Sequence, residues 1–177
     1  NDKIEIIIPC YNHSAYISEA FDSIKKQTYK GLLSVTFIDD NSSDDTNKII
    51  KNIISKNKLN NIKIKLISNI KNLRQHGSIN RAVNESNNEL FIILNDDDYL
   101  VPDCVEKILI TFNKYKDVFM VGGSSIWFEK NRPVHRMKQF DSLKVKLYNP
   151  SQALGYTKLN DLNMTHSSMA FVKTAWE

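Results

Sequence analysis

The sequence has few of the residues that mark secreted, fibrous or membrane-spanning proteins. It contains two cysteines, five glycines and four prolines among 177 residues. Cys10 and Cys104 lie far apart, and neither has a second Cys or a His at metal-binding spacing, which excludes a disulfide framework and a zinc-finger site. No apolar run approaches the roughly 20 residues of a transmembrane helix, and no signal peptide precedes Ile4. We therefore expect a globular protein in a reducing compartment, the cytoplasm.

A strong charge of one sign is also absent. Lys and Arg number 24 against 20 Asp and Glu, for a net charge of +4. A nucleic-acid-binding protein concentrates basic residues on one face, with aromatic residues between them. The sequence has no such stripe, so we expect no nucleic-acid partner. The mild positive charge is compatible with peripheral association at the anionic inner face of the membrane.

Apolar runs and polar turns alternate along the first 121 residues. We expect strands over residues 4–8, 35–38, 62–67, 90–94 and 119–121. Helices are expected to begin near Ser14, Ser43, Ser78 and Pro102, where a capping residue or a proline precedes an apolar stripe. This alternation predicts an α/β fold with a mostly parallel sheet and helices on both faces.

Two segments differ from this pattern. Residues 62–67 alternate apolar side chains with lysines, which is typical of an edge strand or a strand with one wet face. Residues 131–163 are polar and mixed, and we expect long loops or a small hairpin there. We expect no separate second domain.

Polar residues follow three of the expected strands where each strand ends. These segments are residues 9–12, 39–41 and 95–98. In open α/β sheets ligands bind beyond the carboxyl ends of the strands. The three segments are therefore expected to meet on one rim of the sheet, and two of them are acidic.

The acidic segment after the fourth strand is Asn95, Asp96, Asp97 and Asp98. Adjacent carboxylates repel one another, and Mg²⁺ or Mn²⁺ can supply the counter-charge while leaving positions for phosphate oxygens. In an extended chain Asp96 and Asp98 share one face and Asp97 points opposite. One carboxylate would then bind a metal while a neighbour contacts a ribose or sugar hydroxyl. The alternative is a solvated acidic turn.

The other strand ends give less specific signals. Asp39 and Asp40 can accept a hydrogen bond from a nucleobase, or can form a turn before the next helix. Tyr11 can stack on that base or pack in the core. Arg74, expected in a loop before a helix, can hold a diphosphate or lie on the surface. Cys10 is expected to be a packing residue. The histidines with no evident partner, expected to be structural or exposed, are His13, His76 and His135.

In their order and spacing these motifs resemble the inverting GT-A glycosyltransferases of family 2. The resemblance covers residues 6–12, 37–46, 72–77, 94–102 and 166–171, before Trp176 and Glu177. It implies a Rossmann-like three-layer α/β sandwich with a mostly parallel central sheet. It also implies one GT-A domain over residues 1–177, truncated at its C-terminus. Residues 1–125 would form the nucleotide-binding half and 126–177 the start of an acceptor-side region.

The resemblance also implies a donor site. Its donor-binding residues would be Pro9, Tyr11, Asn12, Asp39, Asp40, Arg74, Asn95, Asp96 and His166. Pro9, Tyr11 and Asp40 would form the pocket for the base, with Asp39 beside it. Arg74 would lie near the base or the diphosphate.

The resemblance assigns the metal to the acidic segment. Asp97 would be the main ligand of Mn²⁺ or Mg²⁺, Asp96 would contact the ribose or donor sugar, and His166 would lie on the floor of the donor or acceptor site. The family's Asp-x-Asp motif has Asp at its first position, where this chain has Asn95. The family's catalytic base is a carboxylate beyond Glu177, so the base stays unidentified.

We therefore expect transfer of a sugar from a nucleoside diphosphate sugar, first a UDP-sugar, to a hydroxyl of a glycan or lipid-linked glycan in bacterial surface-polysaccharide synthesis. A nucleotidyltransferase would have a Gly-rich loop after the first strand, and residues 9–14 contain no glycine. A phospho-receiver domain would have its acidic pair after the first strand, and here the pair follows the second. A fragment that binds donor without transferring sugar stays open.

Overall fold

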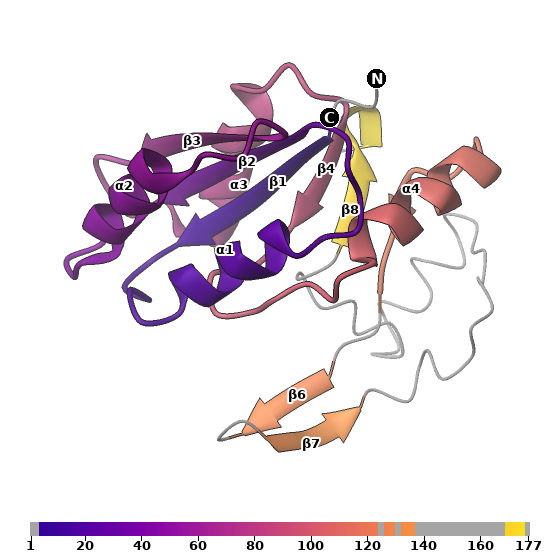
Figure 1. Ribbon diagram of the computed structural model, residues 1–177. Coiled ribbons are helices and arrows are strands. Elements are labelled where there is room, and N and C mark those ends of the chain that lie inside the picture. Colours follow the sequence, from indigo (N-terminus) through magenta and orange to yellow (C-terminus); the bar gives the residue numbers. More distant parts are fainter. Residues whose placement is uncertain (1–3, 124–125, 130–131, 137–168, 176–177) are drawn as a thin grey trace. The chain divides into compact units, whose positions relative to one another are not determined.

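The computed structural model describes residues 4–123, 126–129, 132–136 and 169–175. The chain divides into two compact units: Asn1–Val121 with His166–Glu177, and Gly122–Thr165. The first unit contains a sheet flanked by helices (Figure 1). Within the described residues, no helix combines the length and apolarity needed to cross a membrane.

Strands and helices alternate in the first unit as predicted. Its strands are β1 (Ile4–Cys10), β2 (Leu33–Asp39), β3 (Ile62–Ser68), β4 (Leu90–Ile93), β5 (Met120–Val121) and β8 (Met169–Val172). Its helices are α1 (Ile17–Lys25), α2 (Thr46–Lys56), α3 (Arg74–Asn84) and α4 (Cys104–Lys114), with a 3₁₀ turn η2 (Lys173–Ala175) after β8. The described part of the second unit is an antiparallel hairpin of β6 (Ile126–Glu129) and β7 (Arg132–Arg136).

The sheet of the first unit has the strand order β3-β2-β1-β4-β8-β5. β1 pairs in parallel with β2 and β4, and β2 pairs in parallel with β3. β8 lies between β4 and β5 and is antiparallel to both. The predictions of a mostly parallel sheet and of an edge strand at residues 62–67 are confirmed. The insertion of β8 was not predicted.

Alternate residues of β1 enter two different cores. Ile4, Ile6 and Ile8 belong to the larger core, which also contains buried residues of α1, α2 and α4. Ile7 belongs to the smaller core, which contains residues of α3. Because each face of the sheet is covered by helices, the predicted three-layer arrangement is confirmed (Figure 1).

The predicted serine caps at the first two helices are wrong. α1 begins at Ile17 and α2 at Thr46, and neither N-cap side chain makes a capping hydrogen bond. The carboxylate of Asp44 accepts hydrogen bonds from the backbone N–H of Ser14 and of Thr46, each at 3.0 Å. Asp44 thus links the loop after β1 to the first turn of α2, which Ser43 was expected to cap.

Other boundaries also differ from the predictions. α3 begins four residues before the expected Ser78, and α4 begins after Pro102 at Cys104. β1 continues through Pro9, where it was expected to end. The carbonyl of Ile7 points towards β4 and accepts a hydrogen bond from Leu94 N. Backbone groups two residues apart in a strand point to the same side, so the nitrogen of Pro9 also points towards β4, but beyond its last residue. Its missing N–H therefore costs no hydrogen bond between strands.

Long loops or a small hairpin were expected within residues 131–163. The observed hairpin overlaps the start of this segment, because β7 lies within it and β6 just before it. Residues 137–168 are outside the described part of the chain.

Candidate functional site

A cleft of about 510 Å³ opens beyond the carboxyl ends of β1, β2 and β4. It is lined by Pro9, Cys10, Tyr11, His13, Asp40, Asn72, Arg74, Gln75, Ser78, Asn95, Asp96 and Asp97. Most of the predicted site residues therefore meet on one rim, as expected from the strand ends. Asn12 and Asp39 do not line the cleft, and His166 lies outside the described residues.

Asn12 and Asp39 hold the loops that border the cleft. Asn12 has a φ of 55°, a left-handed conformation that Asn adopts more readily than most residues. Its Oδ1 accepts from the N–H of Ser43 at 2.8 Å. Asp39 is buried; its Oδ1 accepts from Ser42 N at 3.0 Å and its Oδ2 from Asn47 Nδ2 at 2.8 Å. Both oxygens of Asp39 are therefore engaged in the turn that was the alternative to a base contact.

Asp40 is 3% exposed and lines the cleft. Its Oδ1 accepts from Asn69 Nδ2 and from Leu73 N, each at 2.7 Å. Arg81 donates to Asn69 Oδ1 at 2.6 Å, which turns the amide nitrogen of Asn69 towards Asp40. Asp40 Oδ2 has no partner among the described residues, so this oxygen is left to accept an N–H from a ligand.

Tyr11, Arg74 and Cys10 also line the cleft. Tyr11 is 48% exposed, so its ring is not the core residue of the alternative interpretation. Arg74 is the first residue of α3 rather than part of a preceding loop, and its φ is 61°. A helix N-terminus with an arginine favours a bound anion. Burial raises the pKa of the Cys10 thiol well above its usual value, which agrees with a packing residue rather than a nucleophile.

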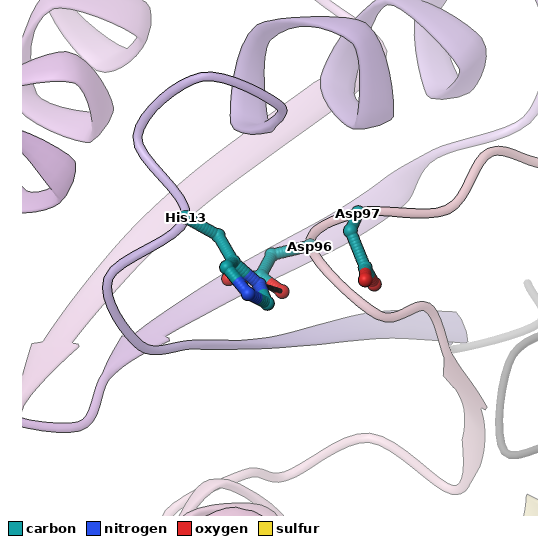
Figure 2. A group of neighbouring side chains, drawn as sticks. All are labelled: His13, Asp96 and Asp97. Atoms are coloured by element: carbon teal, nitrogen blue, oxygen red, sulfur yellow. Dashed lines mark hydrogen bonds and ion pairs between the residues drawn. The ribbon is translucent and has the colours of Figure 1, made fainter. Parts of the chain in front are cut away.

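The acidic segment forms a turn. The N–H of Asp98 donates to the carbonyl of Asn95 at 3.2 Å. Asp96 and Asp97 each place a carboxylate oxygen within 4.8 Å of the other and of a ring nitrogen of His13 (Figure 2). The expectation that Asp97 would point opposite to Asp96 assumed an extended chain and is wrong, because the chain turns directly after β4.

His13 is a cleft residue that the sequence analysis did not find. Its Nδ1 lies 2.8 Å from Asp96 Oδ1. The other oxygen, Oδ2, accepts from Tyr11 N at 3.2 Å, so the loop after β1 engages both oxygens of Asp96. The expectation that His13 has no partner is wrong, because its partner lies 83 positions along the chain. The signal in the sequence was that both residues follow predicted strands.

The contact with Asp96 and the burial of Asp96 shift the pKa values of the two groups. The hydrogen bond to Asp96 raises the pKa of His13 above 6.5. Burial raises the pKa of Asp96, against the opposing effect of His13. Both shifts favour the protonated form, so the pair holds a proton more firmly than the two isolated groups do.

Asn95 connects the acidic turn to α3. Its Oδ1 accepts from Gln75 Nε2 at 2.7 Å, and its Nδ2 donates to Asp98 Oδ2 at 3.1 Å. An aspartate at this position could not donate to Asp98. The amide of Asn95 therefore suits its two hydrogen-bond partners, Gln75 and Asp98. Gln75 also lines the cleft and, like His13, was not predicted as a site residue.

A mostly parallel sheet between helices, with an acidic turn in the cleft beyond its strands, defines a GT-A-type α/β protein. The family model described as "Glycosyl transferase family 2" matches residues 5–176. The chain belongs to this family, as the motifs indicated, and the match favours it over the nucleotidyltransferase and receiver alternatives.

Two relatives show how much of a longer protein the chain matches. The GalNAc(5)-diNAcBac-PP-undecaprenol beta-1,3-glucosyltransferase of Campylobacter jejuni is 30% identical over 120 residues, 66% of this chain and 37% of that protein. The chondroitin synthase of Pasteurella multocida is 33% identical over 122 residues, 67% of this chain and 12% of that protein. The chain therefore spans well under half the length of either relative.

Solved structures share the fold. S. aureus TarS 1-349 matches with a TM-score of 0.71 and 20% identity, over 97% of this chain and 47% of that one. The mannosyltransferase PcManGT from Pyrobaculum calidifontis, in complex with GDP-Man and Mn²⁺, matches with a TM-score of 0.63 and 20% identity, over 68% of this chain and 34% of that one. The predicted GT-A fold is confirmed.

Proposed function

We propose that the protein is a metal-dependent, inverting glycosyltransferase that transfers a sugar from a nucleoside diphosphate sugar to an acceptor hydroxyl. The observation that carries this proposal is one cleft that joins an exposed aromatic ring, at Tyr11, with a buried carboxylate, at Asp40, and an acidic turn, at Asp97. One oxygen of Asp40 makes no hydrogen bond within the described part of the chain. A ring, a hydrogen-bond acceptor and a metal-binding carboxylate suit a base and a diphosphate. Family membership supports the same conclusion.

The proposed donor is a UDP-sugar. Tyr11 would stack on the uracil above Pro9, and Asp40 Oδ2 would accept its N–H. Arg74 and the N-terminus of α3 would hold the diphosphate. TarS, whose fold this chain shares, has been solved in complex with UDP-GlcNAc, which supports the choice of a uridine nucleotide.

A divalent cation fits the acidic turn, because its carboxylates and the His13 ring offer ligand atoms within 4.8 Å of one another. Mn²⁺ or Mg²⁺ at Asp97 would act as a Lewis acid on the departing diphosphate. Asp97 would hold the cation at the exposed edge of the turn. The resemblance gave Asp96 a ribose or sugar contact. Both of its oxygens instead hydrogen-bond to the loop after β1. We propose that it braces that loop.

The proposed acceptor, the catalytic base and His166 lie outside what the structure describes. The acceptor would be a glycan or lipid-linked glycan, consistent with the name of the Campylobacter relative. The base that deprotonates the acceptor hydroxyl would be a carboxylate beyond Glu177, and His166 would lie at the floor of the site. We propose a cytoplasmic location at the inner face of the membrane, and a nucleotide-binding half in residues 1–125 followed by an acceptor-side region in 126–177.

Calorimetric titration with UDP tests the donor site. Wild-type protein should bind UDP at least about tenfold more tightly with Mn²⁺ than without it, a difference of about 1.4 kcal/mol. Asp97→Asn should remove this difference. Asp117→Asn is the matched control, because Asp117 is exposed and does not line the cleft. UDP affinity that responds neither to Mn²⁺ nor to Asp97→Asn would reject the proposal.

The alternative of donor binding without transfer needs a separate measurement. Release of sugar from UDP-sugars, by hydrolysis or by transfer to added glycans, should be compared between these 177 residues and a longer chain that extends beyond Glu177. Sugar transfer by the 177-residue chain would reject the alternative, and transfer by the longer chain alone would support it.

A further inference from the structure

We propose that His13 is a nitrogen ligand of the divalent cation, bound through Nε2, and that Asp96 is the carboxylate that orients its ring. This inference rests on the proposed metal-dependent function and adds a ligand from the loop after β1. The sequence motifs assigned the cation to Asp97 alone. The structure brings His13 to the same turn from the neighbouring strand end (Figure 2).

The hydrogen bond between His13 and Asp96 determines which nitrogen is available. An ionised carboxylate only accepts hydrogen bonds, so the proton of the 2.8 Å contact lies on Nδ1. The lone pair of the neutral ring then lies on Nε2. Metal-binding histidines almost always donate their other ring N–H to a carboxylate or carbonyl, which sets the tautomer and makes the ligating nitrogen more basic. His13 and Asp96 form this arrangement.

The different exposure of the two side chains suits Asp96 to orienting the ring and His13 to binding the ion. The side chain of Asp96 is 6% exposed and has both oxygens engaged, whereas that of His13 is 44% exposed. The ring of Tyr16 meets the imidazole edge-on, with centroids 6.0 Å apart. The His13 ring is therefore held on one side by Asp96 and on another by Tyr16, while it still lines the cleft.

Asp97 completes the ligand pair. It is exposed, lines the cleft and contributes a carboxylate oxygen within 4.8 Å of a ring nitrogen of His13 and of an oxygen of Asp96. Metal–ligand bonds of about 2.0–2.2 Å place two ligands of the same ion up to roughly 4.4 Å apart, which is slightly less than the 4.8 Å within which these atoms lie. Binding of one ion by both residues therefore requires a rotation of the His13 or Asp97 side chain.

An imidazole ligand has a consequence for metal choice. Mg²⁺ prefers oxygen ligands and retains its water, while first-row transition ions accept imidazole more readily. His13 therefore favours Mn²⁺ over Mg²⁺ in this cleft. Replacing the ring by an amide should weaken Mn²⁺ binding by about tenfold and Mg²⁺ binding much less, because only the first ion gains from the nitrogen.

Pulsed electron paramagnetic resonance of the Mn²⁺–UDP complex tests the inference directly. The wild-type spectrum should contain a ¹⁴N coupling from a bound imidazole, and His13→Gln should lose it. His76→Gln should keep it and is the matched control, because His76 does not line the cleft. Asp96→Asn should retain the coupling but weaken Mn²⁺ binding by about tenfold, as expected for a residue that orients a ligand.

The outcomes separate this inference from the proposed function. If Mn²⁺ binding requires Asp97 but no nitrogen coupling is seen, or the coupling survives in His13→Gln, His13 is not a ligand and the donor site still stands. If UDP binding shows no response to Mn²⁺, the proposed function fails as well. Wild-type protein with ¹⁵N-labelled histidine needs no substitution: a ¹⁴N coupling that is not replaced by a ¹⁵N coupling would overturn the inference even if His13→Gln does not fold.

Discussion

Asp96 and Asp97 are adjacent residues of one type in different surroundings. Asp96 is buried and hydrogen-bonded to the loop after β1, whereas Asp97 is exposed in the cleft. The carboxylate of Asp96 is buried with both oxygens hydrogen-bonded, so it stabilises the loop it contacts. The exposed carboxylate of Asp97 is accessible to a ligand. Substitutions of the two residues should therefore have different effects, with Asp97 acting on metal binding and Asp96 on the loop that carries Tyr11.

The titration of His13 tests the contact with Asp96. In metal-free protein the His13 pKa should lie above 6.5, because the carboxylate hydrogen-bonds to the ring. Asp96→Asn should lower it towards 6.5, and Asp98→Asn should leave it almost unchanged. NMR of the ring resonances measures both effects. A His13 pKa that does not respond to Asp96→Asn would contradict this account.

The same shift predicts how the pair affects stability. The pKa of His13 is higher in the folded than in the unfolded protein, so the folded state binds the proton more tightly. The stabilisation is fully present below the unfolded pKa of 6.5. It is lost as the pH rises through the raised pKa of the folded state.

Asn95→Asp tests the departure from the Asp-x-Asp pattern. The new carboxylate keeps the bond from Gln75 but faces Asp98 with a like charge, where Asn95 now donates at 3.1 Å. Metal-free protein should therefore melt at a lower temperature, while Mn²⁺ should bind more tightly by up to about tenfold because of the added charge. Calorimetry and thermal melting with and without Mn²⁺ check this. Unchanged melting and unchanged affinity would show that Asn95 is not close to the cation.

At the scale of elements, apolar runs predicted the strands better than polar residues predicted the helix starts. The apolar run that ends at Leu94 predicted a strand buried on both faces, and the alternation with lysines in residues 62–67 predicted an edge strand or a strand with one wet face. Both patterns are read directly from the order of apolar and polar residues. The helix starts depend on contacts from other loops, as with Asp44, which binds the N–H of Ser14 from 30 positions away. β8 was missed because pairing with β4 depends on the whole sheet.

The same reasoning explains the site. Strand ends predicted that Tyr11, Asp40 and Asp97 meet, because topology alone brings them to one rim. The contacts of His13 with Asp96 and of Gln75 with Asn95 depend on side-chain directions in turns, which periodicity does not specify. The different burial of Asp96 and Asp97 follows from the turn after β4, which an extended chain does not predict.

The buried carboxylate of Glu5 connects β1 with β2 and with the segment before β4, away from the cleft. It lies early in β1 and is 4% exposed. It accepts hydrogen bonds from Thr36 of β2 and from Ser86 and Asn88, which precede β4. The hydrogen bonds from Ser86 and Asn88 to Glu5 hold the connection between α3 and β4 against the sheet.

Glu5→Ala should destabilise the fold without affecting the donor site. Several buried donors would lose their acceptor, at a cost of about 2–4 kcal/mol, and the melting temperature should fall by roughly 5–15 °C for a chain of this length. Glu19→Ala, on the exposed face of α1, is the control and should change little. UDP affinity of the folded variant should equal that of wild type. A melting temperature equal to that of Glu19→Ala would show that the contact contributes little.

At the scale of the whole molecule, the cleft and the sheet beside it draw on different parts of the first unit. Its lining residues all come from the segment before α4, while β8, from near the end of the chain, pairs with β4 and completes the sheet beside the acidic turn. The chain spans 37% of the Campylobacter relative and 47% of TarS 1-349. The proposed donor site is thus lined by residues between Pro9 and Asp97, whereas the proposed acceptor-side region begins at residue 126.

The most direct test of the account is a crystal structure of the protein with UDP and Mn²⁺. We predict the uracil against Tyr11 with its N–H on Asp40, the diphosphate beside Arg74, and the cation bound by Asp97. Nucleotide bound outside this cleft, or a cation that does not contact Asp97, would contradict the central claim that the cleft beyond β1 and β4 is a metal-dependent donor site.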